Sequence, residues 1–202
     1  KEPYIIVHPT QKKVDKTLAN AIVNYFEKTL GKTLVPRFYN RLDMNTSGLI
    51  IIAKNAYTQA FLQDKTEVKK TYKVIASGII EKDDFFIEIP IGKIGDDLRR
   101  IKLSEENGGK SAKTHIKVLE RNREKNITFL EARLYTGRTH QIRAHLSLIG
   151  HPLVGDELYG GDMNLAKRQM LHAYKLEFQN PKTLENLKVE IEIPLDMKEV
   201  LK

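Results

Sequence analysis

The chain has 202 residues, enough to bury most of its apolar surface without disulfides or a structural metal. It contains no cysteine, which excludes disulfide bonds, thiolate metal sites and cysteine nucleophiles, and no apolar run approaches the roughly 20 residues of a membrane-spanning helix. Its net charge of +8 fits a polyanionic partner and a solvated lysine-rich surface equally well.

The first third of the chain predicts two helices among short strands. Tyr4 to Val7 is expected to be a strand, and Asp15 to Leu30 an amphipathic helix that ends at Gly31. Leu49 to Lys54 has the length and composition of a buried strand, and Asn55 to Glu67 is expected to be a second helix. No linker rich in Pro, Gly or Ser follows, so a single domain over residues 1–202 with one continuous core is expected.

From Lys69 onward the alternation of apolar and polar residues predicts strands, with one helix at Thr139 to Ile149. Asn107 to Gly109 predicts a turn within this part of the chain. The expected strands begin around Tyr72 and continue at Phe85 to Ile91, Ala112 to Glu120, Ile127 to Leu134, Tyr174 to Phe178 and Lys188 to Ile193. Runs of strands with few helices predict an α+β fold, with a largely antiparallel mixed sheet and flanking helices.

The loop from Arg41 to Gly48 is the first candidate for chemistry. Asp43 follows Arg41 closely and precedes the apolar segment that starts at Leu49. Turn-forming residues fill the rest of the loop, so a simple turn before a strand explains it equally well. A carboxylate and an arginine at the mouth of a strand are nevertheless typical of a catalytic loop.

A second candidate is the segment from Thr136 to His145. Thr139 is expected to cap the helix, and Arg143, one turn later on the same face, could aim its guanidinium at a carboxylate. A basic surface helix is the simpler interpretation, and His140 and His145 are interpreted as surface or structural histidines.

A third candidate is Tyr72, which stands on a strand between Thr71 and Lys73 in a lysine-rich segment. An aromatic ring flanked by cations suits stacking on a nucleic-acid base. A tyrosine in a strand is more often part of the core.

Together these segments resemble the RluA-like family of RNA pseudouridine synthases. Arg41 to Gly48 is similar to the family signature HRLDxxTSG, and Gly137 to His145 is similar to its GRTHQIRxH segment. Further similar segments occur in the same order as in the family: Lys70 to Lys73, Gly109 to Thr114, Gly150 to Gly160 and Leu171 to Ala173. The histidine before the RLD is replaced by Asn40.

The resemblance implies a pseudouridine synthase catalytic domain and a role for each matching residue. Asp43 would be the catalytic aspartate, Arg143 the arginine that pairs with it, and Tyr72 the tyrosine that packs on the target base. Arg41 would help to hold the flipped-out uridine, and Leu171 would form an apolar wall of the uracil pocket. Arg138 is a further candidate for substrate binding, through the RNA backbone.

The implied reaction isomerises a uridine of ribosomal or transfer RNA, and it needs no cofactor because no redox change occurs. No metal is expected, since the chain has no cysteine and no pair of histidines at helical spacing. The nucleotide must leave the base stack, and an ionised carboxylate in a dry pocket needs a nearby cation. Whether Asp43 attacks or removes a proton stays open. The partner is expected to be RNA and not DNA or a membrane, and the protein is expected to be a cytoplasmic monomer.

Two alternatives remain. A non-catalytic RNA-binding module on the same scaffold would have no reason to carry both Asp43 and Arg143. A metal-free hydrolase using Asp43 with His140 or His145 would need a further acid or base that no spacing identifies. Release of tritium from carbon five of uridine distinguishes the isomerase from both.

Overall fold

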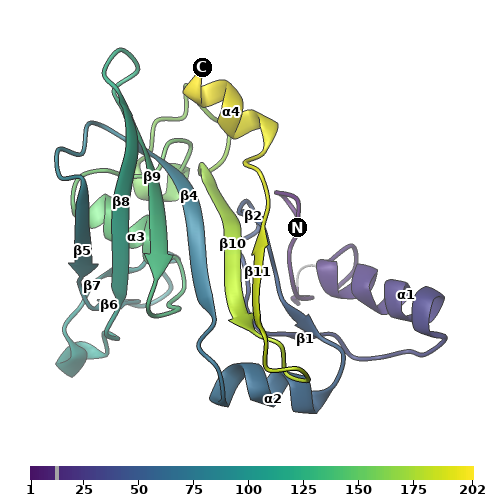
Figure 1. The fold of residues 1–202 in the computed structure, drawn as a ribbon. Helices are drawn as coiled ribbons and strands as arrows, with labels where there is room; N and C mark the ends of the chain where they lie inside the picture. Colours follow the sequence, from purple (N-terminus) through teal and green to yellow (C-terminus); the bar gives the residue numbers. More distant parts are fainter. Residues whose placement is uncertain (12–13) are drawn as a thin grey trace. The chain divides into compact units, whose positions relative to one another are not determined.

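The computed structural model describes residues 1–11 and 14–202, which form two compact units (Figure 1). Unit 1 comprises Lys1–Val68 and Lys175–Ile191, and unit 2 comprises Lys69–Tyr174 and Glu192–Lys202. The single domain over residues 1–202 stays a prediction, and each unit is described by itself.

Unit 1 combines two helices with short strands. Its elements are α1 (Leu18–Leu30), β1 (Arg37–Phe38), β2 (Ser47–Gly48), β3 (Ile52–Ala53), α2 (Ala56–Asp64), the later part of β10 (Leu171–Gln179) and β11 (Asn186–Glu190). β1 pairs antiparallel with β3, and β11 pairs antiparallel with the later part of β10.

Helix α1 begins three residues later than the sequence pattern predicts, because Thr17 caps it. The backbone N–H of Asn20 donates to the Thr17 hydroxyl, and the Thr17 N–H donates to the Asn20 side chain, which is a reciprocal capping box. Gly31 ends the helix as predicted, in the left-handed conformation with φ of 62°.

The strand predicted at Tyr4 to Val7 is not formed. Tyr4 adopts a φ of 64°, which interrupts an extended segment, and the backbone carbonyls of Ile6 and Val7 accept hydrogen bonds from Leu18 and Ala19. These carbonyls therefore bind donors at the start of α1, which a helix leaves without partners of its own. The sequence pattern did not indicate that these carbonyls would bind the start of α1 and not a neighbouring strand.

The apolar segment after Gly48 forms less strand than expected, since only Ile52–Ala53 is regular. The backbone N–H of Ile51 donates to a side chain and not to a neighbouring strand: its acceptor is the Asn40 side-chain oxygen, at 2.9 Å. Helix α2 is likewise shorter than predicted, with Asn55 as its N-cap. Its buried residue Leu62 packs with Val68 and with Leu176 of β10, which forms the core of unit 1.

Unit 2 contains the long strands. Its elements are β4 (Lys69–Ser77), β5 (Asp84–Glu88), β6 (Ile91–Gly92), β7 (Ile101–Lys102), η1 (Glu105–Asn107), β8 (Lys113–Asn122), β9 (Ile127–Leu134), α3 (Gln141–Leu148), η2 (Glu157–Tyr159), the first residues of β10 and α4 (Leu195–Leu201). β4 with β9, β9 with β8, and β8 with β5 are antiparallel pairs that lie side by side in Figure 1.

Most of the strands predicted in this half agree with the structure. β9 has the predicted bounds, β8 is shifted by one residue at its start, and the turn before Gly109 is confirmed by Gly108, whose φ is 88°. The single strand predicted from Phe85 to Ile91 is replaced in the structure by two strands, β5 and β6. Helix α4 was not predicted.

Helices α3 and α4 pack on opposite faces of the unit 2 strands. Thr114 of β8 hydrogen-bonds to residues of α3, so the face that includes Thr114 and, by register, Tyr72 and Ala132 is the α3 face. Residues of the alternate parity, such as Ile75, point to the other face. In Figure 1, α3 lies behind β8 and β9.

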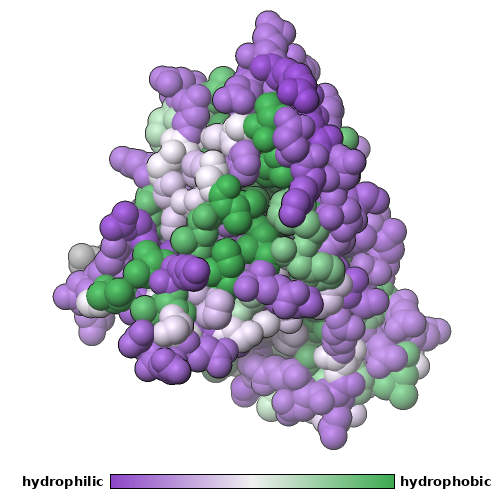
Figure 2. Space-filling view, turned by 90° about the vertical axis from the view of Figure 1, so that its left-hand side faces the viewer, coloured by the Kyte–Doolittle hydropathy of each residue, from purple (hydrophilic) through white to green (hydrophobic). Residues whose placement is uncertain are grey.

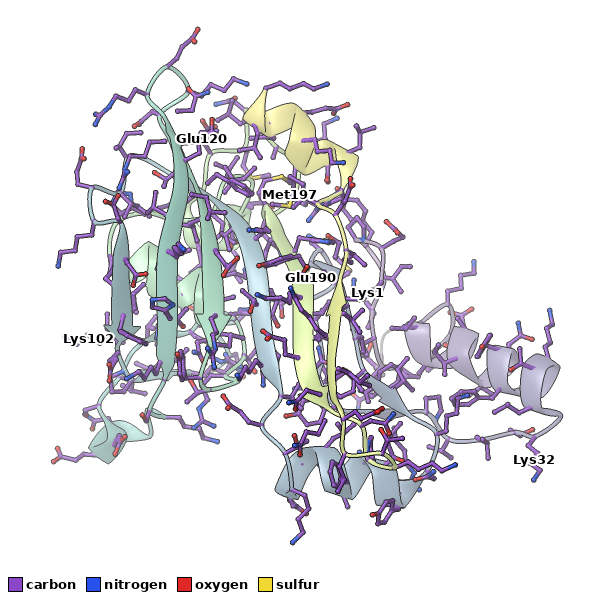
Figure 3. All side chains as sticks on the ribbon, viewed as in Figure 1. Lys1, Lys32, Lys102, Glu120, Glu190 and Met197 are labelled. Carbon is purple, nitrogen blue, oxygen red and sulfur yellow. The ribbon has the colours of Figure 1, made fainter. Side chains whose placement is uncertain are left out.

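The core of unit 2 on the α4 side holds this helix in place. Met197, labelled in Figure 3, is fully buried and packs with Ile75, Ile127 and Met170. Burial of a Met or Ile side chain stabilises the fold by about 1.5–3 kcal/mol. Because a helix as short as α4 is not stable by itself, α4 depends on this tertiary packing.

The α+β class predicted from the sequence is confirmed, with helices and a mixed sheet. Among the described residues no helix is long and apolar enough to cross a membrane. Unit 2 exposes some large apolar side chains, including Phe86 and Leu148, and Figure 2 shows hydrophobic residues gathering in the middle of the face on the β5 side.

Candidate active site

The loop that carries Asp43 is held by its own backbone and by Lys1. The Thr46 N–H donates to the Asp43 carbonyl at 3.0 Å, which closes a turn directly after the carboxylate. Gly48 and Lys1 exchange two backbone hydrogen bonds of 2.8 and 2.9 Å, and the Lys1 Nζ donates to the Met44 carbonyl. The Asp43 side chain is half-buried in this fixed loop.

Arg41 lies on the exposed side of the same loop, while the following residue, Leu42, is buried. Burial lowers the pKa of His8, and the positive charge of nearby Arg41 lowers it further. His8 packs edge-on against Phe38 at 4.8 Å between ring centroids. Arg41 is thus an exposed cation, and its role in binding substrate stays a prediction.

Tyr72 lies on β4 and is nearly fully buried, with 6% of its surface exposed. Its cross-strand neighbour is Ala132 of β9, and Ile116 of β8 continues the same row. Tyr72 thus belongs to the α3 face of the unit 2 strands.

The neighbouring lysine Lys73 points to the other face. Its Nζ is 3.2 Å from a carboxylate oxygen of Glu131 and 4.4 Å from the centre of the Tyr174 ring. Strand geometry places side chains at successive residues on opposite faces. Lys73 is consequently not on the face of Tyr72, whereas Lys70, two residues before Tyr72, is.

Helix α3 starts differently from the prediction. Thr139 lies outside the helix, and the N-cap is His140, whose φ of 56° is rare for a residue with a side chain. The Gln141 carboxamide at the start of the helix holds the preceding loop: its Oε1 accepts from the Arg138 N–H at 2.9 Å and from the Thr136 hydroxyl. The expectation that Thr139 caps α3 was wrong, because the N-cap is His140 and no side chain forms a capping hydrogen bond there.

Arg143 is buried on α3 and forms a two-pronged ion pair with Asp156. The distances are 2.7 Å from Nε to Oδ2 and 2.8 Å from Nη2 to Oδ1. Both side chains are almost completely buried, with 7% and 1% of their surfaces exposed. Bidentate pairs of this kind fix the plane of the guanidinium.

Tyr159 of η2 completes the surroundings of Arg143. The centre of its ring lies 5.0 Å from the guanidinium carbon, within the range of a cation–π contact. Its hydroxyl accepts from the Arg100 N–H at 2.7 Å and lies 3.2 Å from the His140 Nδ1. Burial raises the pKa of the Tyr159 hydroxyl, so it stays protonated at neutral pH.

The two other candidate residues of unit 2 differ in exposure. Arg138 is exposed, and its Nε donates to the Ser111 carbonyl at 3.0 Å. Leu171 is buried at the start of β10, and its carbonyl accepts from the Arg168 guanidinium at 3.4 Å. Arg138 therefore suits a contact with phosphate and Leu171 a contact with an apolar surface.

The histidines of α3 behave as structural residues. His145 is fully buried, and its ring nitrogens contact the Thr114 hydroxyl at 2.9 Å and the Ile89 carbonyl at 3.0 Å. Burial lowers the pKa of His145, which favours the neutral ring. Within the described residues no group of three His, Asp or Glu side chains could hold a metal ion.

The candidate residues thus divide between the units. Asp43 and Arg41 share one loop of unit 1, and Tyr72, Arg138 and Arg143 belong to unit 2. Within unit 2, Tyr72 and helix α3 lie on the same face of the strands. The pairing of Asp43 with Arg143 stays a prediction.

Sequence reasoning assigned no role to Asp156, Tyr159 or Gln141. Asp156 and Tyr159 stand in a segment that contributed to the resemblance, but nothing in their spacing indicates that they surround Arg143. Gln141 was hidden by its hydrophobic neighbours.

Comparisons with known proteins agree with the resemblance. The sequence profile of a family described as RNA pseudouridylate synthase matches residues 1–148. The chain is 41% identical over 197 residues to the uncharacterized RNA pseudouridine synthase YhcT of Bacillus subtilis, covering 96% of this chain and 64% of that protein. It is 38% identical to ribosomal large subunit pseudouridine synthase D of Neisseria meningitidis, covering 98% of this chain and 55% of the relative.

Solved structures show the same fold. The human RNA pseudouridylate synthase domain containing 1 superposes with a TM-score of 0.70 at 26% identity, covering 95% of this chain and 78% of the human chain. This chain spans less than two thirds of the length of YhcT and about half of the meningococcal relative. The family match extends over most of the chain and includes both the Asp43 loop and Arg143, and the chain therefore belongs to the RNA pseudouridylate synthase family.

Proposed function

We propose that the chain carries the catalytic domain of an RNA pseudouridine synthase, which isomerises uridine in RNA to pseudouridine. The observation that carries the proposal is the Arg41 to Gly48 loop, within the segment that the family profile matches. Its backbone hydrogen bonds hold Asp43 in a fixed position at the surface of unit 1.

Asp43 is the catalytic carboxylate in this proposal. It starts a reaction in which the bond from the ribose C1′ to N1 of uracil breaks and a bond from C1′ to C5 forms. C5 loses its proton and N1 gains one, so no oxidant or reductant is needed. Arg143 compensates the charge of Asp43, and Tyr72 packs on the extruded base. The exposure of Arg41 and the half-burial of Asp43 support their access to a nucleotide.

Arg138 and Leu171 serve substrate binding in the same proposal. Arg138 is exposed and can neutralise a phosphate, whereas the buried Leu171 offers an apolar wall to the uracil. Extruding a base costs a few kcal/mol, which such contacts offset.

The hydrolase alternative is less well supported. His145 would have to exchange protons with a substrate, yet it is fully buried and both of its ring nitrogens contact protein acceptors or donors. A non-catalytic RNA-binding module would have no reason to carry both Asp43 and Arg143.

The substrate in this proposal is ribosomal RNA. The support is the similarity to relatives named ribosomal large subunit pseudouridine synthase D, from Neisseria meningitidis and Vibrio cholerae. Transfer RNA is the competing substrate. The proposal includes a monomer that acts in the cytoplasm on RNA and not on DNA.

Tritium release tests the activity. Ribosomal RNA and transfer RNA, each labelled at carbon five of uridine, are incubated with the wild-type chain and with Asp43→Asn. The wild type should release label from ribosomal RNA, and Asp43→Asn should release less than about a thousandth as much, because an amide can neither attack nor accept a proton.

Asp64→Asn is the matched control, since Asp64 is an exposed aspartate at the end of α2 in the same unit. It should retain wild-type turnover. Residual activity of Asp43→Asn within about tenfold of the wild type, a barrier change of about 1.4 kcal/mol, would falsify the assignment of Asp43. Release from transfer RNA alone would overturn the choice of substrate.

A further inference from the structure

One end of the unit 2 strands is open on the face opposite α3. Thr114 of β8 points to the α3 face, so its neighbours Lys113 and His115 point to the other face. Helix α4 packs against that other face around Ile75 and Ile127, at the start of β9. Lys113 and His115 lie beside the end of β9, where no helix of the described part of unit 2 covers the strands in Figure 1.

Two aromatic side chains are exposed on this open end. Phe86 of β5 is 47% exposed and Tyr135, directly after β9, is 46% exposed, and their ring centroids lie 5.7 Å apart. His115 is the cross-strand neighbour of Phe86, with 4.7 Å between the ring centroids. The uncovered face of an antiparallel sheet usually carries polar side chains. Two half-exposed rings at this place therefore indicate a binding surface for flat, partly apolar groups.

Cations lie beside both rings. The Lys113 Nζ is 4.4 Å from the centre of the Phe86 ring, and the Arg133 guanidinium carbon is 4.8 Å from the centre of the Tyr135 ring. Lys117, two residues after His115, is exposed on the same face. Aromatic rings with cations beside them suit single-stranded nucleic acids, because the bases stack on the rings while the phosphates meet the cations.

The carboxylates beside the rings are already paired with a cation or a histidine. The pairs, with their N–O distances, are Asp84–His115 (2.6 Å), Glu88–Lys113 (2.8 Å) and Glu131–Lys73 (3.2 Å). Asp84 and Glu88 lie on β5, at the edge of the sheet, whereas Lys117 and Arg133 lie on the inner strands β8 and β9. The phosphates of a bound strand are therefore expected over β8 and β9 and not along the β5 edge.

We propose that this aromatic surface, made of Phe86, Lys113, His115, Lys117, Arg133 and Tyr135, binds single-stranded RNA. Bases stack on the rings of Phe86 and Tyr135, which requires them to be unpaired, and phosphates lie beside the cations of β8 and β9. The surface faces away from Tyr72 and α3, so it binds RNA outside the segment that carries the target uridine. This binding requires no turnover, and it goes beyond the proposed function.

The fluorescence of a single tryptophan tests the stacking, because the chain contains no tryptophan of its own. Phe86→Trp keeps an aromatic ring at this position, and a base that stacks on the indole should quench its emission. The probe is an oligoadenylate of about eight nucleotides, a usual length for such surfaces, which contains no uridine and cannot be a substrate of the isomerase. A saturating concentration of this probe should quench the emission by about half or more.

Tyr57→Trp is the matched control. Tyr57 is a 69% exposed aromatic residue of α2 in unit 1, outside the aromatic surface. Its emission should change by less than about a tenth at the same probe concentration, because no base stacks there.

The affinity should depend on the ring and on the cations. Phe86→Ala should raise the Kd of the oligoadenylate about tenfold, the usual effect of losing one stacked base, while Phe86→Tyr should stay within about twofold of the wild type. Lys117→Gln should reduce the slope of log affinity against log salt by roughly 0.7, as expected for one phosphate contact. Both positions are exposed, so thermal unfolding of the variants should resemble that of the wild type.

Three results would overturn the inference: no quenching in Phe86→Trp, equal quenching in Tyr57→Trp, or an unchanged Kd for Phe86→Ala. Missing quenching together with a self-association that sedimentation detects in the wild type and not in Phe86→Ala would assign the surface to a second copy of the chain. A wild type without tritium release contradicts the proposed function alone, because binding of the oligoadenylate involves no turnover.

Discussion

Two helices, α3 and α4, cover opposite faces of the unit 2 strands, and each takes part in an ion pair that contains a buried arginine. On the α3 side Arg143 binds Asp156, and on the α4 side Arg168 binds Asp196, in both cases through Nε and Nη2. The carboxylates differ: the Asp156 side chain is 1% exposed, whereas that of Asp196 is 43% exposed.

The surroundings of the two arginines differ as well. Arg168 also donates to the carbonyls of Gln169 and Leu171, so its donors serve the neighbouring backbone. Arg143 instead lies against the Tyr159 ring. The same bidentate geometry therefore joins chain segments on the α4 side, and on the α3 side it sets the orientation of one cation.

The largest difference between the two sides is expected for turnover. Arg143→Lys keeps the charge but cannot bind Asp156 with two coplanar N–H groups, so kcat should fall roughly a thousandfold, as for removal of a preorganised donor. Arg168→Lys, the equivalent change on the α4 side, should leave kcat within about threefold. Steady-state tritium release checks both variants, and equal kcat values for the two would break the comparison.

The α4 side should instead respond in stability. Asp196→Asn leaves Arg168, with 1% of its side chain exposed, without a carboxylate, so the free energy of unfolding should fall by roughly 3 kcal/mol. Replacing both partners, with Arg168→Met and Asp196→Leu together, should cost less than the single change, since no buried charge remains. Urea unfolding measures both. A loss below about 1 kcal/mol for Asp196→Asn would mean that water replaces the carboxylate.

These differences could be predicted only in part from the sequence. Alternation placed β9 and most of β8 correctly, because buried residues such as Leu130 and Ile116 alternate with neighbours that are only partly buried or exposed. Both ion pairs escaped prediction, since Asp156 and Asp196 lie 13 and 28 residues from their arginines and no local pattern connects such positions.

The ends of the helices were predicted less well for a related reason. Thr139 is a residue type that often caps a helix, but α3 starts one residue later than this pattern predicts, after an N-cap at His140 in the left-handed conformation. The site residues, by contrast, came from resemblance to a family and not from physical pattern, because a turn before a strand explains the Asp43 loop equally well.

The pH dependence of stability should reflect the α4 side. Burial, and then the charge of Arg168, lowers the pKa of His172 to about 4. Because the unfolded chain binds a proton near pH 6.5, the free energy of unfolding should be largest above that pH and fall as the pH drops toward 4. At pH 5 this residue alone accounts for a loss of about 2 kcal/mol relative to neutral pH.

His172→Asn is the variant that isolates this contribution, because asparagine cannot take up a proton. Its unfolding free energy should depend less steeply on pH between 4 and 6.5 than that of the wild type, whatever its value at pH 7. Urea titrations at several pH values give the two slopes. Identical slopes would show that His172 is protonated equally in the folded and unfolded chain.

The smallest expected effect concerns phosphate contacts, and it again separates the two faces. Arg138, exposed just before α3, is proposed to contact the RNA backbone, and Lys73 points to the opposite face and pairs with Glu131. Each phosphate contact to single-stranded RNA adds roughly 0.7 to the slope of log affinity against log salt. Arg138→Gln should reduce the slope by about that amount and weaken the binding of all RNAs similarly.

Lys73→Gln, the matched control, should change neither the slope nor the affinity, because the charge of Lys73 is already compensated within the sheet. Binding measured at several salt concentrations decides: an equal reduction for both variants would mean that RNA also contacts Lys73, and an unchanged slope for Arg138→Gln would remove Arg138 from the RNA interface.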